Sequence, residues 1–404
     1  MITTPTAGST PSRPRPSQPG ASVIDQHARV GALPCCLAVS VLLLTACGES
    51  TPTVNSENLR VASSVDDAGG MDALVATAQK EGTLNAIALP RDWANYGALI
   101  DGFSNKYGIE VKVAQPDASS QDEIDAVKRY KGQPEAPDVL DMGRSFAQSA
   151  AEQGLLSPYK VKTYKKIPDN QKDPLARWYN NYGGYVSIGC DAAEIEECPQ
   201  TFDDLRKPEY LGKVSLNGEP TKAGSAFAGV YAAALANKGS LDNIGPGLDF
   251  FKDLTKSENF NPVQSTPSTI ESGETPISID WDYLNTSYAD SFREKGMDWQ
   301  VTVPSDGIYA EYYSQAINKD APHPAAARLW QEYVFSEEGQ NLRLEGYARP
   351  VLLDSMKREG SLHEIAAAWL PSVDGTPRFP SEEQSSRAKE AVAKGWRKAV
   401  SRND

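Results

Sequence analysis

Thr83-Leu84-Asn85-Ala86-Ile87-Ala88-Leu89 is the first of three short apolar runs that decide the fold class. The other two are Ile109-Glu110-Val111-Lys112-Val113, which alternates as a half-buried strand does, and Asp138-Val139-Leu140-Asp141-Met142. The stretches between and after them, 93–107, 122–130 and 145–152, have the spacing of amphipathic helices. Strands and helices that alternate with short connections predict an α/β layer with a largely parallel sheet.

A second unit of the same kind begins near residue 185. Its pattern predicts strands at 213–216, 275–280 and 300–304, and helices at 225–237 and 248–256. The last third predicts helices at 324–335, 337–344, 362–369 and 381–400. A chain of 404 residues is longer than one compact domain usually is, so we expect two lobes.

The composition is that of an acidic protein with enough apolar surface for a core. Hydrophobic residues make up 40% of the chain and charged residues 23%. The 54 acidic residues exceed the 40 basic ones, which gives a formal net charge of −14. Because duplex affinity comes largely from basic side chains that neutralise phosphates, the charge argues against a nucleic-acid partner.

The N-terminal segment has the features of an export signal. Residues 1–22 are rich in Pro, Ser and Thr, and the apolar run 33–44 is shorter than the roughly 20 residues that a spanning helix needs. The run ends in Leu44-Thr45-Ala46-Cys47, which resembles a bacterial lipobox and implies cleavage before a lipidated Cys47. The alternative is an uncleaved anchor helix with an incidental cysteine. We expect a disordered leader and signal peptide at 1–46 and a flexible tether at 47–80.

Two cysteines, Cys190 and Cys198, follow Cys47 in the chain. In an oxidising compartment their spacing suggests a disulfide that closes the loop between them, and the alternative is two free thiols. A zinc site would want further Cys and His ligands, which the sequence does not offer here. We therefore expect a disulfide and no metal or other cofactor.

Several motifs, in order along the chain, resemble bacterial extracellular solute-binding proteins of ABC importers. The resemblance is to the branch that contains ferric-ion, polyamine, thiamine and phosphonate binders, and it covers roughly residues 82–349. It rests on Asn105-Lys106-Tyr107-Gly108-Ile109-Glu110-Val111, Ala136-Pro137-Asp138-Val139-Leu140, Gln153-Gly154-Leu155-Leu156-Ser157-Pro158-Tyr159, Pro199-Gln200-Thr201-Phe202-Asp203-Asp204-Leu205, Pro208-Glu209-Tyr210-Leu211-Gly212-Lys213-Val214, Ala321-Pro322-His323-Pro324-Ala325-Ala326-Ala327 and Ser336-Glu337-Glu338-Gly339-Gln340.

The resemblance implies a two-lobed α/β fold of the type II periplasmic-binding-protein class, with a ligand cleft between the lobes and two hinge strands. Lobe 1 is expected at 81–183, lobe 2 at 184–300, and a return to lobe 1 with C-terminal helices at 301–404. Such a protein is a monomer outside the cytoplasm, held at the membrane by its lipid, that delivers one small solute to an ABC permease without chemistry.

Solutes in such sheets bind beyond the carboxyl ends of the strands, so the loops there supply candidate contacts. The loop after the first strand offers Arg91, Asp92 and Trp93, and the loop after the third offers Arg144 and Ser145. Thr221 and Ser225 precede a predicted helix whose free N–H groups suit an anion. The alternative for these two residues is ordinary helix capping.

Two clusters combine acids with aromatic residues. They are Asp280-Trp281-Asp282-Tyr283, after a predicted strand, and Tyr309, Glu311, Tyr312 and Tyr313. Carboxylates and aromatic faces suit an ammonium group, so the clusters favour a polyamine-like cation. The alternative is that the rings belong to the core and the acids lie in water.

Other solutes and another class of protein stay open. Ferric binders use two adjacent tyrosines, whereas Trp281-Asp282-Tyr283 offers one phenol, and Arg91, Arg144 and Lys222 would suit a phosphonate or phosphate ester. A secreted hydrolase with paired carboxylates is the enzymatic alternative. The chain has three histidines, and we find no H-E-x-x-H, G-x-S-x-G or phosphate-binding loop that would favour an enzyme.

Overall fold

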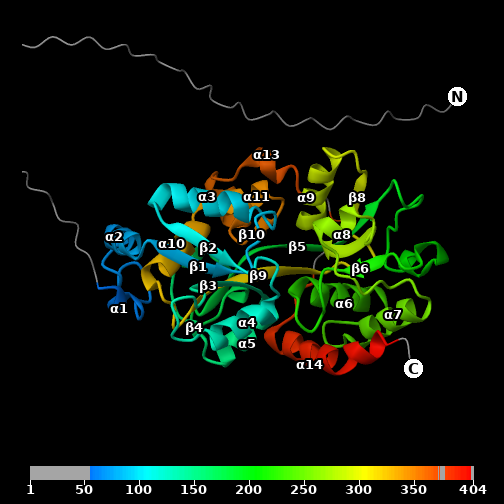
Figure 1. Cartoon of the computed structure of the whole chain (residues 1–404), viewed down its shortest axis with the longest axis horizontal. Coiled ribbons are helices and arrows are strands. Elements are labelled where there is room, and N and C mark those ends of the chain that lie inside the picture. The colour runs from blue at the N-terminus through cyan, green and yellow to red at the C-terminus, as the bar shows by residue number, and fades with distance from the viewer. Residues whose placement is uncertain (1–54, 372, 374–377, 402–404) are drawn as a thin grey trace, which may run out of the picture. The chain divides into compact units, whose positions relative to one another are not determined.

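The computed structural model describes residues 55–371, 373 and 378–401, and the fold is drawn in Figure 1. The predicted signal peptide, the lipidated Cys47 and the start of the tether lie outside the described residues. Within the described part, no helix is both long enough and apolar enough to cross a membrane.

The first sheet has the strand order β2-β1-β3-β9-β5. Strand β1 is parallel to both β2 and β3, whereas β9 runs antiparallel to β3 and to β5. Short strands β4 and β10 pair with β9 and β5. The bounds are β1 Thr83–Ile87, β2 Glu110–Ala114, β3 Val139–Gly143, β4 Leu156–Ser157, β5 Trp178–Asp191, β9 Ala310–Asn318 and β10 Arg349–Pro350. The parallel part is the α/β layer that the sequence predicted.

The helices of this first lobe form where the sequence spaces apolar residues on one face. In α3, Tyr96, Leu99, Ile100 and Phe103 are buried, and the helix ends at Gly108, whose φ of 69° favours glycine. The bounds are α3 Tyr96–Tyr107, α4 Ser120–Arg129, α5 Arg144–Glu152, α10 Pro324–Val334, α11 Glu337–Glu345, α12 Leu353–Glu359 and α13 Glu364–Ala367. The short 3-10 turns are η1 Tyr164–Lys166 and η2 Asp169–Gln171 here, and η3 Asp204–Arg206 and η4 Pro208–Tyr210 in the second lobe.

The second sheet contains β5, β7 and β6 in that order, with β8 also paired to β5. Strands β6 and β7 are parallel, and β7 and β8 are antiparallel to β5. The bounds are β6 Val214–Leu216, β7 Ile277–Trp281 and β8 Trp299–Thr302, with helices α6 Gly224–Ala236, α7 Gly245–Lys256, α8 Pro267–Glu271 and α9 Asp282–Arg293. We use lobe 1 for the first sheet with its helices and lobe 2 for the second.

Strand β5 belongs to both lobes. Its first part pairs with β9 in the first sheet, and its last part pairs with β7 and β8 in the second. Fourteen residues in one strand, nearly all buried, therefore join the two lobes. The sequence predicted a strand only near residues 185–188, because the glycines and asparagines at its start have low strand propensity. The disulfide between Cys190 and Cys198 forms as predicted and ties the end of β5 to the next loop.

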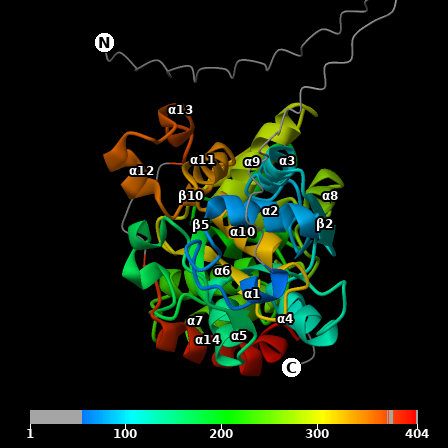
Figure 2. The same cartoon turned by 90° about the vertical axis from the view of Figure 1, so that its left-hand side faces the viewer.

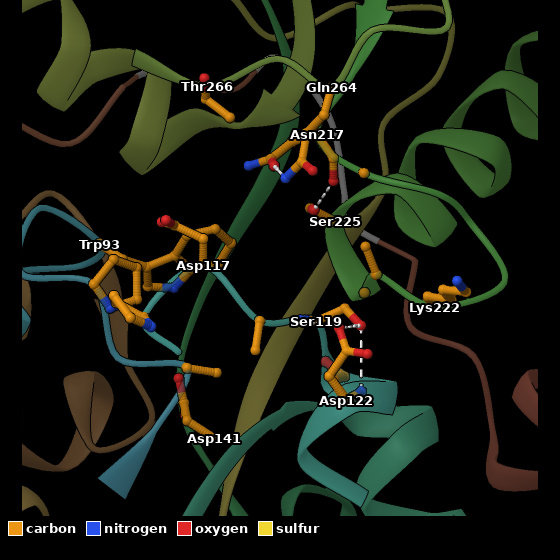
Figure 3. Close-up of a pocket in the computed structure, with 18 of the residues that line it drawn as sticks. Trp93, Asp117, Ser119, Asp122, Asp141, Asn217, Lys222, Ser225, Gln264 and Thr266 are labelled. Atoms are coloured by element: carbon orange, nitrogen blue, oxygen red, sulfur yellow. Dashed lines mark hydrogen bonds between the residues drawn. The ribbon is translucent and has the colours of Figure 1, made fainter. Parts of the chain in front are cut away.

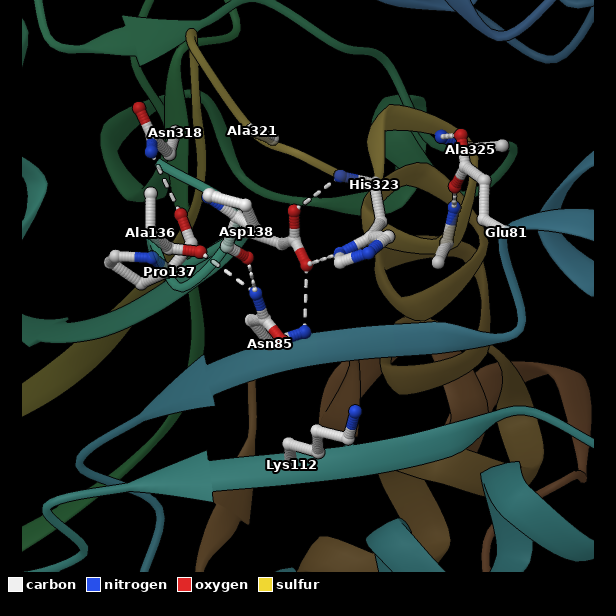
Figure 4. Close-up of polar contacts among 12 residues, drawn as sticks. Glu81, Asn85, Lys112, Ala136, Pro137, Asp138, Asn318, Ala321, His323 and Ala325 are labelled. Carbon is white, nitrogen blue, oxygen red and sulfur yellow. Dashed lines mark hydrogen bonds and ion pairs between the residues drawn. The ribbon is translucent and has the colours of Figure 1, made fainter. Parts of the chain in front are cut away.

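Helices α1 Ser56–Leu59 and α2 Met71–Glu81 lie in the stretch that was predicted to be a tether, which corrects that boundary. The fully buried Arg328 of α10 holds this segment, because its guanidinium donates to the carbonyl oxygens of Ala62 at 2.9 Å and Arg60 at 2.8 Å. Figure 2 shows α1 and α2 beside α10. The Glu81 carboxylate accepts from the backbone N–H groups of Ala325 and Ala326 at the start of α10 (Figure 4). Folded structure thus begins well before residue 81.

His323, at the entry to α10, binds the buried carboxylate of Asp138 (Figure 4). The backbone N–H of His323 and its Nδ1 lie 2.7 and 2.8 Å from the two carboxylate oxygens, and Asn85 N–H donates at 2.6 Å. The hydrogen bond to Asp138 raises the pKa of His323. These contacts hold β1, β3 and α10 together, which agrees with a structural role for His323.

The C-terminal helix α14, Glu382–Ala399, packs against helices of both lobes. Toward lobe 1, Lys389 Nζ lies 3.6 Å from the ring centroid of Phe146 in α5. Toward lobe 2, Trp396 packs edge-on against Phe251 of α7 at 5.3 Å between centroids. Figure 1 shows α14 running along the bottom of both lobes.

Candidate ligand-binding site

A cavity of ≈ 350 Å³ lies between the lobes, at the ends of the strands where the sequence predicted it (Figure 3). Lobe 1 lines it with the loops that follow β1 and β2 and with Asp141 of β3, and lobe 2 with the loop after β6 and the entry to α8. Tyr288 of α9 and Tyr313 of β9 complete the wall.

The lobe 1 wall is acidic and aromatic. Asp92, Trp93, Asp117 and Asp141 all line the cavity, and Asp92 and Asp117 are exposed. The Trp93 ring is partly exposed and meets the ring of Tyr313 edge-on, with 5.3 Å between centroids. An aromatic face beside carboxylates is a suitable environment for an organic cation.

A hydrogen-bonded chain behind this wall fixes Trp93 and Asp141. Trp93 Nε1 donates to the hydroxyl of Tyr182 at 2.7 Å, and that hydroxyl donates to Asp141 Oδ2 at 2.6 Å. Gln315 Nε2 donates to Asp141 Oδ1 at 2.8 Å. Burial raises the pKa of Asp141, and the charge of Arg343 opposes that rise. Tyr182 belongs to β5, so the chain connects the cavity to the strand that joins the lobes.

Arg343 supplies positive charge to this region without forming an ion pair at the cavity. It is fully buried, and its guanidinium carbon lies 3.9 and 4.1 Å from the ring centroids of Tyr96 and Tyr182. Its Nη1 donates to the carbonyl oxygen of Ala94 at 2.8 Å. Cation–π contacts of this kind stabilise a buried guanidinium that has few hydrogen bonds.

Two further acids at the cavity, Asp122 and Glu123, belong to the first turn of helix α4. Ser119 and Asp122 form a capping box at its start, and the hydrogen bond from Ser119 lowers the pKa of Asp122. Glu123 is buried and accepts from the N–H of Asp141 at 2.9 Å, and burial raises its pKa well above the usual range. Glu123 therefore connects α4 to β3, whereas Asp122 caps the start of α4.

The lobe 2 wall consists mainly of neutral hydrogen-bonding groups. Asn217, Ser225, Gln264 and Thr266 line it (Figure 3). Ser225 Oγ donates to the carbonyl oxygen of Asn217 at 2.8 Å, and Gln264 Nε2 donates to Asn217 Oδ1 at 3.1 Å. Asn217 Nδ2 donates at 2.8 Å to Oδ2 of Asp280, which lies behind the wall. Burial raises the pKa of Asp280 to about 7.

The two lobes touch beside the cavity. The N–H of Gln121 in lobe 1 donates to the carbonyl oxygen of Lys222 in lobe 2 at 3.3 Å. Gly143 and Gly224 meet so closely that a Cβ on Gly143 would lie 3.1 Å from the Cα of Gly224. The cleft is therefore closed at this end, and a side chain at Gly143 would hold the lobes apart.

The structure brings three of the residues predicted from the lobe loops into the cavity wall, namely Asp92, Trp93 and Ser225. Arg91 is exposed and pairs with Asp101 at 2.5 Å. Arg144 lies over the ring of Trp178, Ser145 is buried in α5, and Thr221 donates to the carboxylate of Glu219. These four residues do not line the cavity.

The stretch Asp280-Trp281-Asp282-Tyr283 passes from β7 into α9 and lies behind the cavity wall. Asp280 reaches the cavity only through Asn217. Trp281 and Tyr283 are stacked core residues, with 6.2 Å between centroids, and Asp282 pairs with Arg349 at 2.5 Å. Both rings therefore belong to the core, as the alternative interpretation of this stretch predicted. Both acids are buried and hydrogen-bonded within the protein, where that interpretation placed them in water.

Along β9, the residue that lines the cavity is Tyr313. Tyr309 donates to Glu311 at 3.0 Å and stacks on Tyr231 away from the cavity, and Tyr312 points to the opposite face of the strand, toward Phe379. Sequence reasoning missed Asp117, Asp141, Asn217, Gln264 and Tyr288 as wall residues. Position was the available signal for Asn217, which directly follows the carboxyl end of β6, whereas Asp141 lies in the middle of β3.

The described residues contain no cluster of three or more His, Cys, Asp or Glu side chains placed to hold a metal ion. Ferric binding by tyrosines would have to use Tyr288 and Tyr313, the phenols in the wall.

Comparisons with known proteins agree with this architecture. The family described as bacterial extracellular solute-binding protein matches residues 135–372. An uncharacterized protein of Haemophilus influenzae is 28% identical over 254 residues, which cover 59% of this chain and 69% of the relative.

Two solved structures share the fold. One is the periplasmic binding protein AfuA from Actinobacillus pleuropneumoniae with fructose-6-phosphate bound, at a TM-score of 0.59 and 18% identity over 78% of this chain and 99% of that one. The other is assigned as a spermidine/putrescine ABC transporter from Listeria monocytogenes, at a TM-score of 0.58 and 15% identity over 78% of this chain and 98% of that one.

The chain belongs to the bacterial extracellular solute-binding proteins. It is thus a two-lobed solute-binding protein of the ABC transporter family, which acts outside the cytoplasm with a small-molecule ligand and an ABC permease as its partners.

Proposed function

We propose that the protein captures a polyamine-like cation and delivers it to the permease, unchanged, as a monomer anchored through lipidated Cys47. The observation that carries this proposal is the charge of the cavity. The acids that line it are Asp92, Asp117, Asp122, Glu123, Asp141 and Glu219, against Lys222 as the basic residue of the lining. An ammonium group that enters such a cavity gains charge-assisted hydrogen bonds, whereas an anion meets repulsion.

The aromatic side chains support the same choice. Trp93, Tyr288 and Tyr313 line the cavity beside the carboxylates. A desolvated cation over such rings gains roughly 2 kcal/mol per good contact, and the alkyl segments of a polyamine are apolar and suit the same surfaces. The sequence predicted a combination of acids and aromatic rings at the site. Most of the acids and rings that line the cavity are not the residues of the two predicted clusters.

Closure supplies the mechanism of capture. A solute shifts the open–closed equilibrium only by its differential affinity for the closed state. In the closed arrangement both walls face one cavity, so a solute held by both gains contacts that neither lobe offers alone. Exclusion of water strengthens the attraction between an ammonium group and the carboxylates.

A thermal-shift screen of the mature chain at pH 7.5 tests the proposal. Spermidine and putrescine are expected to raise the melting temperature, since a ligand at about 100 times its Kd adds about 2.7 kcal/mol of stability. Ferric citrate, thiamine, 2-aminoethylphosphonate, fructose-6-phosphate and simple sugars are the comparison set. A shift with phosphate esters alone, and none with either polyamine, would contradict the proposal.

A phosphate ester is the second candidate, and helix α6 favours it. The helix begins at the cavity with Gly224 and Ser225, and its N-cap Ala223 provides no side-chain cap. The first N–H groups of a helix attract anions, and Lys222 is adjacent. Glu219, 3.7 Å from Lys222, offsets this attraction, so we place the anion second. The AfuA structure carries such a solute.

A further inference from the structure

Lobe 2 contains a buried carboxylate directly behind the cavity wall. Strands β6 and β7 are parallel and in register at Leu216 and Ile279, so the next residues, Asn217 and Asp280, are neighbours at the carboxyl ends of the strands. Asp280 is 1% exposed and Asn217 is 8% exposed. Asp280 accepts from the N–H of Trp281 at 2.8 Å and from Asn217 Nδ2 at 2.8 Å.

These contacts fix the direction of two amide groups. An ionised carboxylate only accepts hydrogen bonds, so Asn217 must turn its Nδ2 toward Asp280 and its Oδ1 away. Asn217 Oδ1 then accepts from Gln264 Nε2, which turns Gln264 Oε1 away from Asn217. Both amides line the cavity. The remaining lone pair of Asn217 Oδ1 and the oxygen of Gln264 are therefore the acceptors that these amides offer a solute, beside the second hydrogen of each NH2 group.

We propose that Asp280 is a positioning residue for solute recognition: through Asn217 and Gln264 it makes the lobe 2 wall accept hydrogen bonds, and so selects solutes that donate them. This inference rests on the proposed function, because an ammonium group is the donor that it would select. Asp280 itself does not line the cavity, so it acts through the amides.

A neutral Asp280 would not impose this direction. The protonated acid both donates and accepts, so Asn217 is free to turn its NH2 group toward the cavity. The titratable groups near the carboxylate are the hydroxyls of Tyr283 and Tyr288 from α9 and of Tyr313 from β9, all with pKa values raised by burial. Burial also raises the pKa of Asp280, to about 7, which brings the change of direction into an accessible range of pH.

An NMR titration tests the orientation without any ligand. In ¹⁵N-labelled wild-type protein, the side-chain NH2 signals of Asn217, assigned by their loss in Asn217→Ser, are expected to shift between pH 5.5 and 8.5 with a midpoint near 7. In Asp280→Asn the same signals are expected not to titrate. Asn217 signals that are equally pH-independent in the wild type, or that titrate unchanged in Asp280→Asn, would overturn the inference.

Calorimetric titration with spermidine tests the consequence for recognition. Between pH 5.5 and 7.5 spermidine stays protonated, and wild-type affinity is expected to fall about tenfold as the pH is lowered through 7. Asp280→Asn is expected to bind about tenfold more weakly at pH 7.5 and to lose the pH dependence. Glu311→Gln is the matched control, because Glu311 is also buried with a pKa raised to about 7, yet lies off the cavity.

The two hypotheses fail in different ways. If the wild type binds no polyamine while the Asn217 signals titrate with Asp280, the cation proposal is wrong and the orientation by Asp280 stands. If spermidine binds equally well to wild type and Asp280→Asn at every pH, the positioning role is wrong and the cation proposal stands.

Discussion

The two walls of the cavity differ in how they hold charge. Lobe 1 presents carboxylates at the surface, with Asp92 and Asp117 exposed. Lobe 2 presents the amides of Asn217 and Gln264, pairs its exposed acid Glu219 with Lys222, and keeps the carboxylate of Asp280 one layer behind. Exposed charges attract a solute over a distance but are weakened by water, whereas buried ones act over a bond length and impose direction. The difference suggests that lobe 1 supplies attraction and lobe 2 supplies selectivity.

Removing the exposed charges of lobe 1 is expected to have the largest effect on spermidine affinity. The double variant Asp92→Asn, Asp117→Asn is expected to weaken spermidine binding about 100-fold, because two charge-assisted contacts are lost. Calorimetry measures the Kd. Asp203→Asn, which changes an exposed acid away from the cavity, is the control and is expected to keep wild-type affinity. Equal affinities in all three proteins would remove the attraction assigned to lobe 1.

The buried carboxylate of Asp280 is expected to make the free energy of unfolding depend on pH. The pKa of Asp280 is raised by burial, so its ionisation costs stability as pH rises from its unfolded value toward about 7. Asp280→Asn removes that cost. The free energy of unfolding of the variant minus that of the wild type is therefore expected to be about 2 kcal/mol larger at pH 8 than at pH 5. Urea unfolding at both pH values measures this. The same relative stability at both pH values would contradict a buried, titrating Asp280.

A smaller effect is expected from the hydrogen-bonded chain behind Trp93. Tyr182→Phe removes the hydroxyl that joins Trp93 to Asp141 and keeps the ring that stacks on Tyr313. Spermidine affinity is expected to fall about tenfold, because both wall residues lose their fixed orientation. Tyr309→Phe is the matched control, since its hydroxyl binds Glu311 off the cavity. If both variants bind alike, the chain has no role in recognition.

The smallest expected effect is the dependence of spermidine affinity on salt concentration, which should differ between variants of the two walls. Raising NaCl from 50 to 500 mM is expected to weaken spermidine binding to wild type about threefold, because exposed carboxylates are screened. The lobe 1 double variant is expected to lose this dependence, whereas Gln264→Ala, in the wall of lobe 2, is expected to keep it. Calorimetry at the two salt concentrations decides, and equal salt dependence in both variants would contradict the division of roles.

Much of the fold could be predicted from the sequence, because the strands are short and the helices are amphipathic. The run Thr83–Ile87 and the helix Tyr96–Tyr107 followed from periodicity, and Gly108 marked the end of that helix. Periodicity failed at β5, whose first part is rich in Asn, Tyr and Gly, and at α9, which starts directly from β7 without a loop. The boundaries 183/184 and 300/301 between the lobes stay a prediction.

The site was harder to predict, because loops have no periodicity. Arg91 and Asp92 are adjacent, yet one pairs with Asp101 outside and the other faces the cavity. In β9 the alternation of strand side chains separates Tyr312 from Tyr313, but which of them faces the cavity depends on the sheet that the strand joins. Likewise, Asp280 is one layer too deep for direct contact, which only the register of β6 and β7 reveals.

The C-terminal helix has a mechanical consequence. Because α14 packs on α5 through Lys389 and on α7 through Trp396, separating the two lobes must detach or slide one end of this helix. The large apolar contact of Trp396 favours release at the Lys389 end, where burial lowers the pKa of the lysine to about 8. The helix would then limit how far the lobes separate, and a fluorophore near Lys389, which does not line the cavity, would report each opening.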